Sequence, residues 1–211
     1  MNADPLAASY RWLEYAAFGR ALERCRFDFL SRAVTARRVL ILGEGDGRFL
    51  TRLVECNRHA EIVAIDSSAR MLDLARRRIS SGAHERVAFH QLDALASPLP
   101  AGAFDLAVTH FFLDCFDWGG VAAIISKVNA VLKPGALWLV GEFQAPERGW
   151  RRIHAQLWLN TMYRFFGVTT GLRTSVLPDH RALLIASGFA ELERRERRNG
   201  LIVSQVWRKE T

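Results

Sequence analysis

The chain has 211 residues, of which 50% are hydrophobic and 24% are charged. This length and composition suit one globular domain with a sizeable core, and they exclude a disordered or a fibrous chain. The formal net charge of +7 at pH 7 and the pI near 10.0 point to an anionic partner such as nucleic acid, a membrane surface or an acidic small molecule. However, the arginines are spread along the chain in pairs and triplets, which disfavours nucleic acid as that partner.

The three cysteines, Cys25, Cys56 and Cys115, are widely spaced and form no C-x-x-C pair. They indicate neither a zinc site nor a redox dithiol, so we expect no bound metal and a reduced intracellular setting. Charged residues interrupt the first thirty positions, and no later stretch reaches the roughly 18 apolar residues that a membrane span needs. We accordingly expect a cytoplasmic protein without a membrane span.

The chain begins with helical periodicity and then changes character. Residues 6–31 carry apolar side chains at the 3.6-residue spacing of one or two amphipathic helices. From residue 38, short β-rich runs alternate with helical stretches, which predicts a parallel sheet with helices on both faces. The expected strands are 39–42, 61–66, 86–91, 104–109 and 136–143, and the expected helices between them are 48–57, 69–80 and 121–132.

The end of the chain differs from this alternation. A helix is expected over 178–187, closed by Gly188, and it leads into strands at 190–198 and 201–208. These strands flank Asn199-Gly200, which favours a two-residue type I′ turn, so the sheet should finish with an antiparallel pair. Between the fifth strand and this helix, residues 149–167 are helical in pattern and rich in large apolar side chains, which suggests an insertion over the edge of the sheet.

The strongest motif is a buried strand that runs into three alternate glycines and then a helix. Gly43, Gly45 and Gly47 allow the backbone to turn sharply and to lie flat against a ligand. A dinucleotide fingerprint would need its third glycine at position 48, where this chain has Arg48. The spacing therefore weakens the NAD interpretation and leaves room for a cofactor without a pyrophosphate.

Two acids follow at the ends of later strands. Asp66 closes the second strand, 19 residues after Gly47, where a carboxylate can accept hydrogen bonds from both ribose hydroxyls. Asp93 ends the third strand, and an acid there can accept a hydrogen bond from the exocyclic amine of a purine.

At this point the chain resembles the class I, Rossmann-like S-adenosylmethionine-dependent methyltransferases over residues 38–208. Any one matching feature is weak, but five in register form a specific pattern. They are the glycine turn at 43–47, Ile65–Leu72, Leu92–Ala94, Phe104–Thr109 and Leu132–Gly135.

The resemblance implies S-adenosyl-L-methionine as cofactor and S-adenosyl-L-homocysteine as product. It implies that Gly43, Gly45 and Gly47 pack against the methionine part, that Asp66 binds the ribose and that Asp93 with Ala94 recognises adenine. The matched motifs add Ser67, Met71 and Thr109 to the cofactor-binding residues.

The implied fold is a doubly wound, mostly parallel α/β sheet of seven strands with an antiparallel terminal hairpin. One methyltransferase domain would fill residues 1–211. Its parts would be an N-terminal helical lid (1–37), the cofactor-binding core (38–143), a helical insertion over the site (144–177), and the final helix with the hairpin (178–211).

One position departs from the family pattern. The family usually has an acid two residues before the first glycine, and this chain has Ile41 there. Glu44 and Asp46, inside the turn, are candidates to supply the missing negative charge for the cofactor's ammonium or sulfonium. The alternative is that both are turn acids that favour the N-terminus of the following helix.

The segment after the fourth strand supplies the catalytic candidates. His110 could take a proton near neutral pH, and Asp114 could orient it or bind a cationic substrate. Equally, His110 could be a structural residue and Asp114 a helix cap. Phe111, Phe112 and Phe116 would either wall a pocket or fill the core.

These features predict methyl transfer to a small-molecule acceptor, partly apolar or acidic in character. The absence of an Asn/Asp-Pro-Pro-Tyr motif after the fourth strand disfavours base and amide methylation. The alternatives are an RNA or protein methyltransferase that uses the basic surface, and a protein that binds S-adenosylmethionine without transferring its methyl group. A dehydrogenase ranks last because of Arg48.

Overall fold

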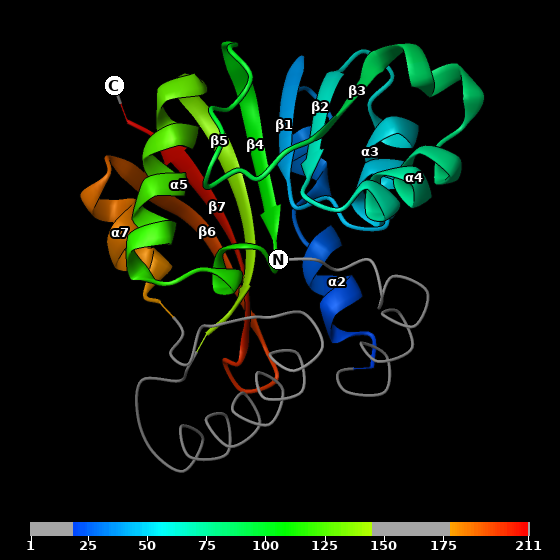
Figure 1. Ribbon diagram of the computed structural model, residues 1–211. Coiled ribbons are helices and arrows are strands. Elements are labelled where there is room, and N and C mark those ends of the chain that lie inside the picture. Colours follow the sequence, from blue (N-terminus) through cyan, green and yellow to red (C-terminus); the bar gives the residue numbers. More distant parts are fainter. Residues whose placement is uncertain (1–18, 145–177, 211) are drawn as a thin grey trace.

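The computed structural model describes residues 19–144 and 178–210. Seven strands form one sheet in the order β3-β2-β1-β4-β5-β7-β6 (Figure 1). The first five strands run parallel to one another and β7 runs antiparallel to its neighbours β5 and β6. This is the predicted doubly wound sheet with its antiparallel terminal pair.

The strand order reverses between β1 and β4, where the chain passes from one half of the sheet to the other. In open α/β sheets, ligands bind at such a reversal, beyond the carboxyl ends of the strands. The strands are β1 (Arg38–Leu42), β2 (Glu61–Asp66), β3 (Val87–Gln91), β4 (Phe104–His110), β5 (Leu132–Phe143), β6 (Phe189–Arg197) and β7 (Ile202–Lys209).

Helices cover both faces of the sheet, as Figure 1 shows. On one face lie α2 (Ala21–Phe27), α3 (Arg48–Cys56) and α4 (Ala69–Arg78), and on the other lie α5 (Trp118–Val131) and α7 (His180–Ala186). Short 3-10 helices are η2 (Leu30–Ala33), η3 (Ser81–Arg86) and η4 (Leu113–Cys115).

Each face has its own apolar core. Phe49, Leu50 and Leu53 of α3 pack on the face that includes Ile41 and Val108. On the opposite face, the apolar residues of α5 pack against the sheet around Trp138 and Trp207, which are fully buried. The near-continuous burial of β1 and β5 explains why their sequences read as apolar runs rather than as alternating ones.

Two predicted details are wrong. The strand expected at 136–143 begins at Leu132, because Lys133–Gly135 continue the strand through a register shift opposite β4. The two-residue turn at Asn199-Gly200 is a four-residue connection, since the last strand pair is Arg197 with Ile202. Arg198, Asn199 and Gly200 all have positive φ there, so the left-handed tendency of Asn-Gly extends one residue earlier.

Two predicted regions lie wholly or partly outside the described residues. The helical insertion expected over 144–177 is represented only by Gln144, and the N-terminal lid expected over 1–37 only from Gly19 onward. Within residues 19–144 and 178–210, no helix has the length and apolar character required to cross a membrane.

Candidate functional site

The glycine turn at the end of β1 favours glycine at three positions. Gly43, Gly45 and Gly47 have φ values of +67°, +64° and +84°, a region that other L-residues rarely adopt. A Cβ on Gly43 would lie 2.4 Å from the Phe112 ring, and one on Gly47 would lie 2.5 Å from the Ala75 Cα. A Cβ on Gly45 would meet no atom of the described residues within 4 Å, so this backbone borders open space in that part of the structure.

Asp66 joins the end of β2 to this turn. Its Oδ2 accepts the Gly45 N–H at 2.9 Å, and its Oδ1 accepts the Ser68 N–H at 2.9 Å. The Ile65 carbonyl accepts the Gly43 N–H at 2.9 Å and so holds the two strand ends together. Each Asp66 oxygen can accept further bonds, because a carboxylate has about four lone-pair positions. Asp66, which the sequence predicts to bind the ribose, therefore lies at the end of β2 beside the glycine turn.

The loop after β3 is anchored by a lysine from α5. Lys127 Nζ donates to the carbonyls of Ala94, Leu95 and Ser97 at 2.9, 2.5 and 2.9 Å. In the same loop Asp93 Oδ1 accepts the N–H groups of Leu95 and Ala96. The other carboxylate oxygen, Oδ2, takes no part in these two hydrogen bonds. Asp93 and Ala94, the residues expected to read adenine, are thus held on a fixed loop.

A buried carboxyl pair lies at the ends of β4 and β5. Glu142 is 1% exposed and accepts the N–H groups of Phe112, Leu113 and Asp114 at 3.1, 2.9 and 3.3 Å. Burial raises the pKa of Asp114 to about 6, and burial together with the Asp114 charge raises the pKa of Glu142 well above its ordinary value. Near neutral pH the pair therefore holds one proton between its two carboxyl groups.

Glu142 was missed in the sequence, although a signal was present. It is the one acid within the apolar run 136–143, and a charge inside a strand buried on both faces must have partners. Those partners, three consecutive backbone N–H groups about 30 positions earlier, are not visible in the sequence.

The chain is similar in sequence to known proteins. Residues 39–135 match the family model described as a methyltransferase domain. The demethylmenaquinone methyltransferase of Thermus thermophilus is 33% identical over 153 residues, which cover 72% of this chain and 68% of that protein. The chain belongs to the class I S-adenosylmethionine-dependent methyltransferases.

Solved structures show the same fold for this methyltransferase. The mitomycin 7-O-methyltransferase MmcR aligns with a TM-score of 0.71 at 14% identity, over 99% of this chain and 61% of MmcR. The N-methyltransferase NodS of Bradyrhizobium japonicum, in complex with S-adenosyl-L-homocysteine, aligns with a TM-score of 0.64 at 18% identity. That alignment covers 90% of this chain and 89% of NodS.

The residues of the methyltransferase's turn fit a cationic methyl donor. Glu44 is 9% exposed, its Oε1 accepts the Leu50 N–H at 3.1 Å, and its Oε2 has no hydrogen-bond partner among the described residues. Burial, with Asp46 and Asp66 nearby, raises the pKa of Glu44 to about 8. A buried carboxyl oxygen without a partner is costly, and the ammonium or sulfonium of S-adenosylmethionine would offset that cost.

The same contacts support part of the alternative for the turn acids. Gly47 is the N-cap of α3 and has no side chain to cap it, so Glu44 caps the Leu50 N–H instead. Asp46 forms ion pairs with Arg48 at 2.9 Å and with Arg78 at 3.0 Å. Asp46 is therefore engaged by the protein, and Glu44 is the turn acid that keeps an oxygen available.

Two cofactor candidates beside Asp66 differ in exposure. Ser67 is exposed, whereas Met71 is buried in the first turn of α4, where its N–H donates to Ser68 Oγ at 3.1 Å.

Thr109 is fully buried, and its hydroxyl accepts the Trp138 indole N–H at 3.0 Å. The Thr109 side chain thus lies in the core, and its role in cofactor binding stays a prediction.

His110 and Asp114 do not form the predicted pair. The His110 ring packs edge-on against Phe49, with centroids 4.8 Å apart, and lies beside Gly141. Burial, and secondarily the Arg26 charge, lowers the pKa of His110 to about 3, so the ring is neutral and a weak base at pH 7. Asp114 instead belongs with Glu142, and the structure favours the structural interpretation of His110.

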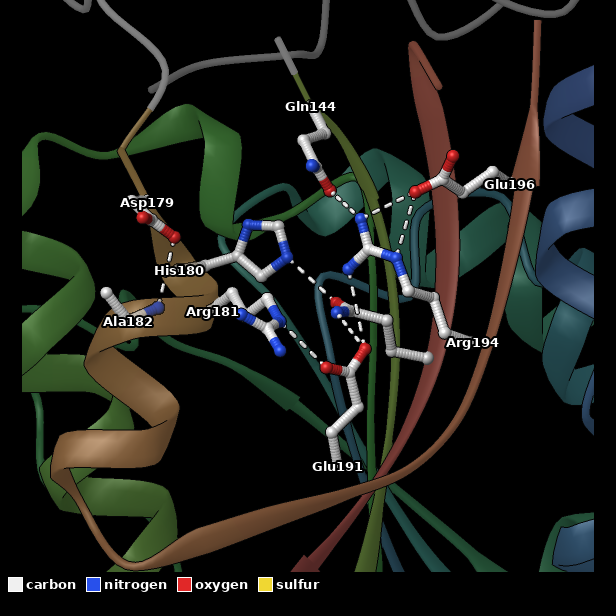
Figure 2. A network of polar contacts seen from close by, with 9 residues as sticks. Gln144, Asp179, His180, Arg181, Ala182, Glu191, Arg194 and Glu196 are labelled. Atoms are coloured by element: carbon white, nitrogen blue, oxygen red, sulfur yellow. Dashed lines mark hydrogen bonds and ion pairs between the residues drawn. The ribbon is translucent and has the colours of Figure 1, made fainter. Parts of the chain in front are cut away.

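A second polar cluster joins α7 to β6, β7 and the end of β5 (Figure 2). The buried ring of His180 contacts the Gln205 side-chain oxygen at 2.9 Å, and the Gln205 amide donates to Glu191 at 2.9 Å. Glu191 also accepts from Arg181 and Arg194 at 2.8 and 3.4 Å. Burial lowers the pKa of His180, so its ring is neutral at pH 7 and serves to fasten the helix to the sheet.

No group of three or more potential metal ligands occurs among the His, Cys, Asp and Glu residues of the described ranges. Cys25 is buried against Ser204, and Cys115 donates to the Phe111 carbonyl at 3.8 Å.

Proposed function

We propose that this methyltransferase acts on a small, partly apolar acceptor that binds beside the loop following β4. The observation that carries this proposal is the composition of that loop. It carries Phe111, Phe112, Phe116 and the buried Asp114, and Glu142 of β5 lies against it. Apolar walls with a few convergent polar groups are typical of small-molecule sites.

The loop adjoins the donor site through a direct contact. Phe112 packs on Gly43, the first glycine of the turn, and also on Phe116, with ring centroids 5.1 Å apart. Phe111 adopts a left-handed φ of +55° and packs on Phe143 at 5.0 Å. A strained backbone held by packing on both sides supports a functional position for these aromatic rings.

We propose a donor site made from the turn and the ends of β2 and β3. Its backbone surface would be Gly43, Gly45 and Gly47, with Glu44 facing the donor's positive charge. Asp66 would bind the ribose, with Ser67 and Met71 beside it, and Asp93 with Ala94 would recognise the adenine.

When bound, S-adenosylmethionine supplies an activated methyl group for in-line displacement. The protein's part is to position the acceptor and, where the accepting atom carries a proton, to remove it. The carboxyl pair of Asp114 and Glu142 suits that task, because its pKa near 6 leaves one carboxylate ionised at neutral pH. The acceptor's proton would pass to this pair.

The Thermus thermophilus relative supports a small-molecule acceptor. It is a demethylmenaquinone methyltransferase. We infer an acceptor of comparable class for this enzyme, a ring compound with an ionisable hydroxyl. The side chains that would select among such compounds are those of this chain and are not inferred from the relative.

The test measures S-adenosyl-L-homocysteine formation by the purified enzyme. The acceptors offered are reduced demethylmenaquinone, simple phenols and naphthols, total RNA, and a protein extract. We expect product with one or more of the ring compounds, and none from Asp66→Asn. Product formed only with RNA or with protein would refute the small-molecule acceptor. Calorimetric titration with S-adenosyl-L-homocysteine reports donor binding independently of any acceptor.

A further inference from the structure

A hollow of about 660 Å³ lies between α2, the start of α3, the end of α4 and β6. We call it the arginine cavity, because seven of the eleven described residues that line it are arginines. Among these eleven residues, only Glu23 and Asp28 carry negative side chains. The formal charge of this small concave surface is therefore strongly positive.

Two acids at the cavity are each shared between two arginines, whereas Glu23 pairs with Arg20 at 3.6 Å. Asp28 forms ion pairs with Arg195 at 3.6 Å and, more closely, with Arg197. Asp46, just behind the wall, is likewise shared by Arg48 and Arg78. Because one carboxylate cannot neutralise two guanidinium groups, an excess of positive charge remains.

Other arginines of the wall add to this excess. Arg24 forms no ion pair within residues 19–144 and 178–210, and Arg52 has an exposed partner, Glu55, one turn along the same helix. Exposed pairs of this kind hold their partners weakly. Both guanidinium groups are thus available to a ligand.

We propose that the arginine cavity binds a small molecule that carries several negative charges on oxyanion groups, such as a di- or triphosphate. Guanidinium groups recognise phosphate through paired N–H bonds, and seven of them drawn from four elements surround one hollow. Like charges gathered in a concave surface repel one another, and a bound polyanion removes that repulsion. This site goes beyond the proposed methyl transfer.

The dimensions favour a small ligand over a nucleic acid. Ligand cavities commonly measure about 300 to 1,000 Å³, a range that includes this one. Single-stranded nucleic acid binding relies on aromatic platforms along an extended groove, and the wall has one aromatic residue, Phe27.

The experiment titrates the purified full chain with sodium tripolyphosphate at low ionic strength, using calorimetry. The test variant is Arg24→Gln with Arg52→Gln, two arginines that hold no long-range contact in the described structure. The matched control is Arg58→Gln with Arg208→Gln, two exposed arginines at the opposite end of the sheet. We expect the test variant to lose about tenfold or more in affinity and the control to stay within about twofold.

Further arms separate the sources of the anion. Vesicles that contain phosphatidylglycerol and a short RNA are titrated with the same three proteins. Equal losses in the test and control variants, or no tripolyphosphate binding to the native protein, would overturn the proposal. Tighter binding of vesicles or RNA that tripolyphosphate does not displace would also overturn it. Titration of every variant with S-adenosyl-L-homocysteine confirms folding, and its outcome does not depend on the cavity.

Discussion

Glu142 and Asp114 place two buried carboxyl groups together at the carboxyl edge of the sheet, with the Asp114 N–H bonded to Glu142 Oε2 at 3.3 Å. Glu142 also accepts the two preceding N–H groups of the loop. One side chain on β5 thereby sets the path of the segment that follows β4. The position of the loop that carries Phe111, Phe112 and Phe116 therefore depends on Glu142. The protonation of the carboxyl pair depends on the same residue.

Replacing Glu142 by leucine should destabilise the protein strongly. Three buried N–H groups would lose their acceptor, and each costs about 1 kcal/mol or more when left unsatisfied. We expect a loss of about 3 kcal/mol in the free energy of unfolding, measured by urea titration. Glu142→Gln, which keeps an acceptor oxygen, should lose less. The exposed Glu85→Leu is the control, and an equal loss there would contradict the assigned role.

The pH dependence of the reaction should follow Asp114 rather than His110. The pKa of Asp114 is about 6 and that of His110 about 3, so only Asp114 changes its ionisation near neutral pH. We expect kcat/KM for a protonated acceptor to rise through about pH 6. Asp114→Asn should abolish that limb, whereas His110→Asn should retain it. A limb that disappears with His110 would reverse the assignment.

Glu44→Gln should change stability in a pH-dependent direction. The pKa of Glu44 is about 8 in the folded protein against 4.5 ordinarily, so the folded state holds a proton that the unfolded state releases. The free energy of unfolding is therefore not reduced by Glu44 below pH 4.5, and it falls as pH rises to 8. The variant should match the native protein at pH 4 and exceed it by about 2 to 4 kcal/mol at pH 8.5.

The same substitution tests the role of Glu44 in donor binding. Ionised Glu44 attracts a cation, so the affinity of the native enzyme for S-adenosylmethionine should increase between pH 6 and 8. In Glu44→Gln the affinity should be lower and nearly independent of pH. Calorimetric titration at three pH values measures both. Unchanged affinity would leave Glu44 solely as the cap of α3.

Lys127 should influence the binding of S-adenosylmethionine without contacting it. Lys127→Met removes the ammonium that donates hydrogen bonds to three carbonyls of the loop that carries Asp93 and Ala94. We expect a loss of about tenfold in affinity for S-adenosyl-L-homocysteine, with a stability loss of about 1 to 2 kcal/mol. Lys209→Met is the matched control, because Lys209 also holds two carbonyls, those of Asn129 and Leu132, where α5 passes into β5, and does not bond to this loop. It should lose stability alone.

The three glycines of the turn should respond differently to alanine. Gly47→Ala places a Cβ 2.5 Å from the Ala75 backbone, so it should be severely destabilising. Gly45→Ala meets open space and costs only its left-handed φ, about 1 kcal/mol. Its effect should appear in donor binding, measured by calorimetry, since the added methyl group would enter the donor's place. Unimpaired binding by Gly45→Ala would move the donor away from the turn.

The alternation of strands and helices, the glycine turn, and the acids at Asp66 and Asp93 could all be predicted from the sequence. Each depends on residues a few positions apart: apolar runs specify buried strands, and alternate glycines specify a sharp turn. The antiparallel finish also follows from a local signal, although the length of its turn does not. The sequence did not show that Asp114 would lie against Glu142, or that the Thr109 hydroxyl would bond to Trp138.

The contacts that the sequence did not show join residues that are distant in the chain. Thr109 is committed to Trp138, Asp46 to Arg78, and the loop after β4 to Glu142, all about 30 positions away. Strand order brings such residues together, and a sequence pattern records a residue's neighbours along the chain and not its neighbours across the sheet. Local backbone preference therefore determined the elements and the turn, whereas burial and charge at the assembled edge of the sheet decided which side chains remain available for chemistry.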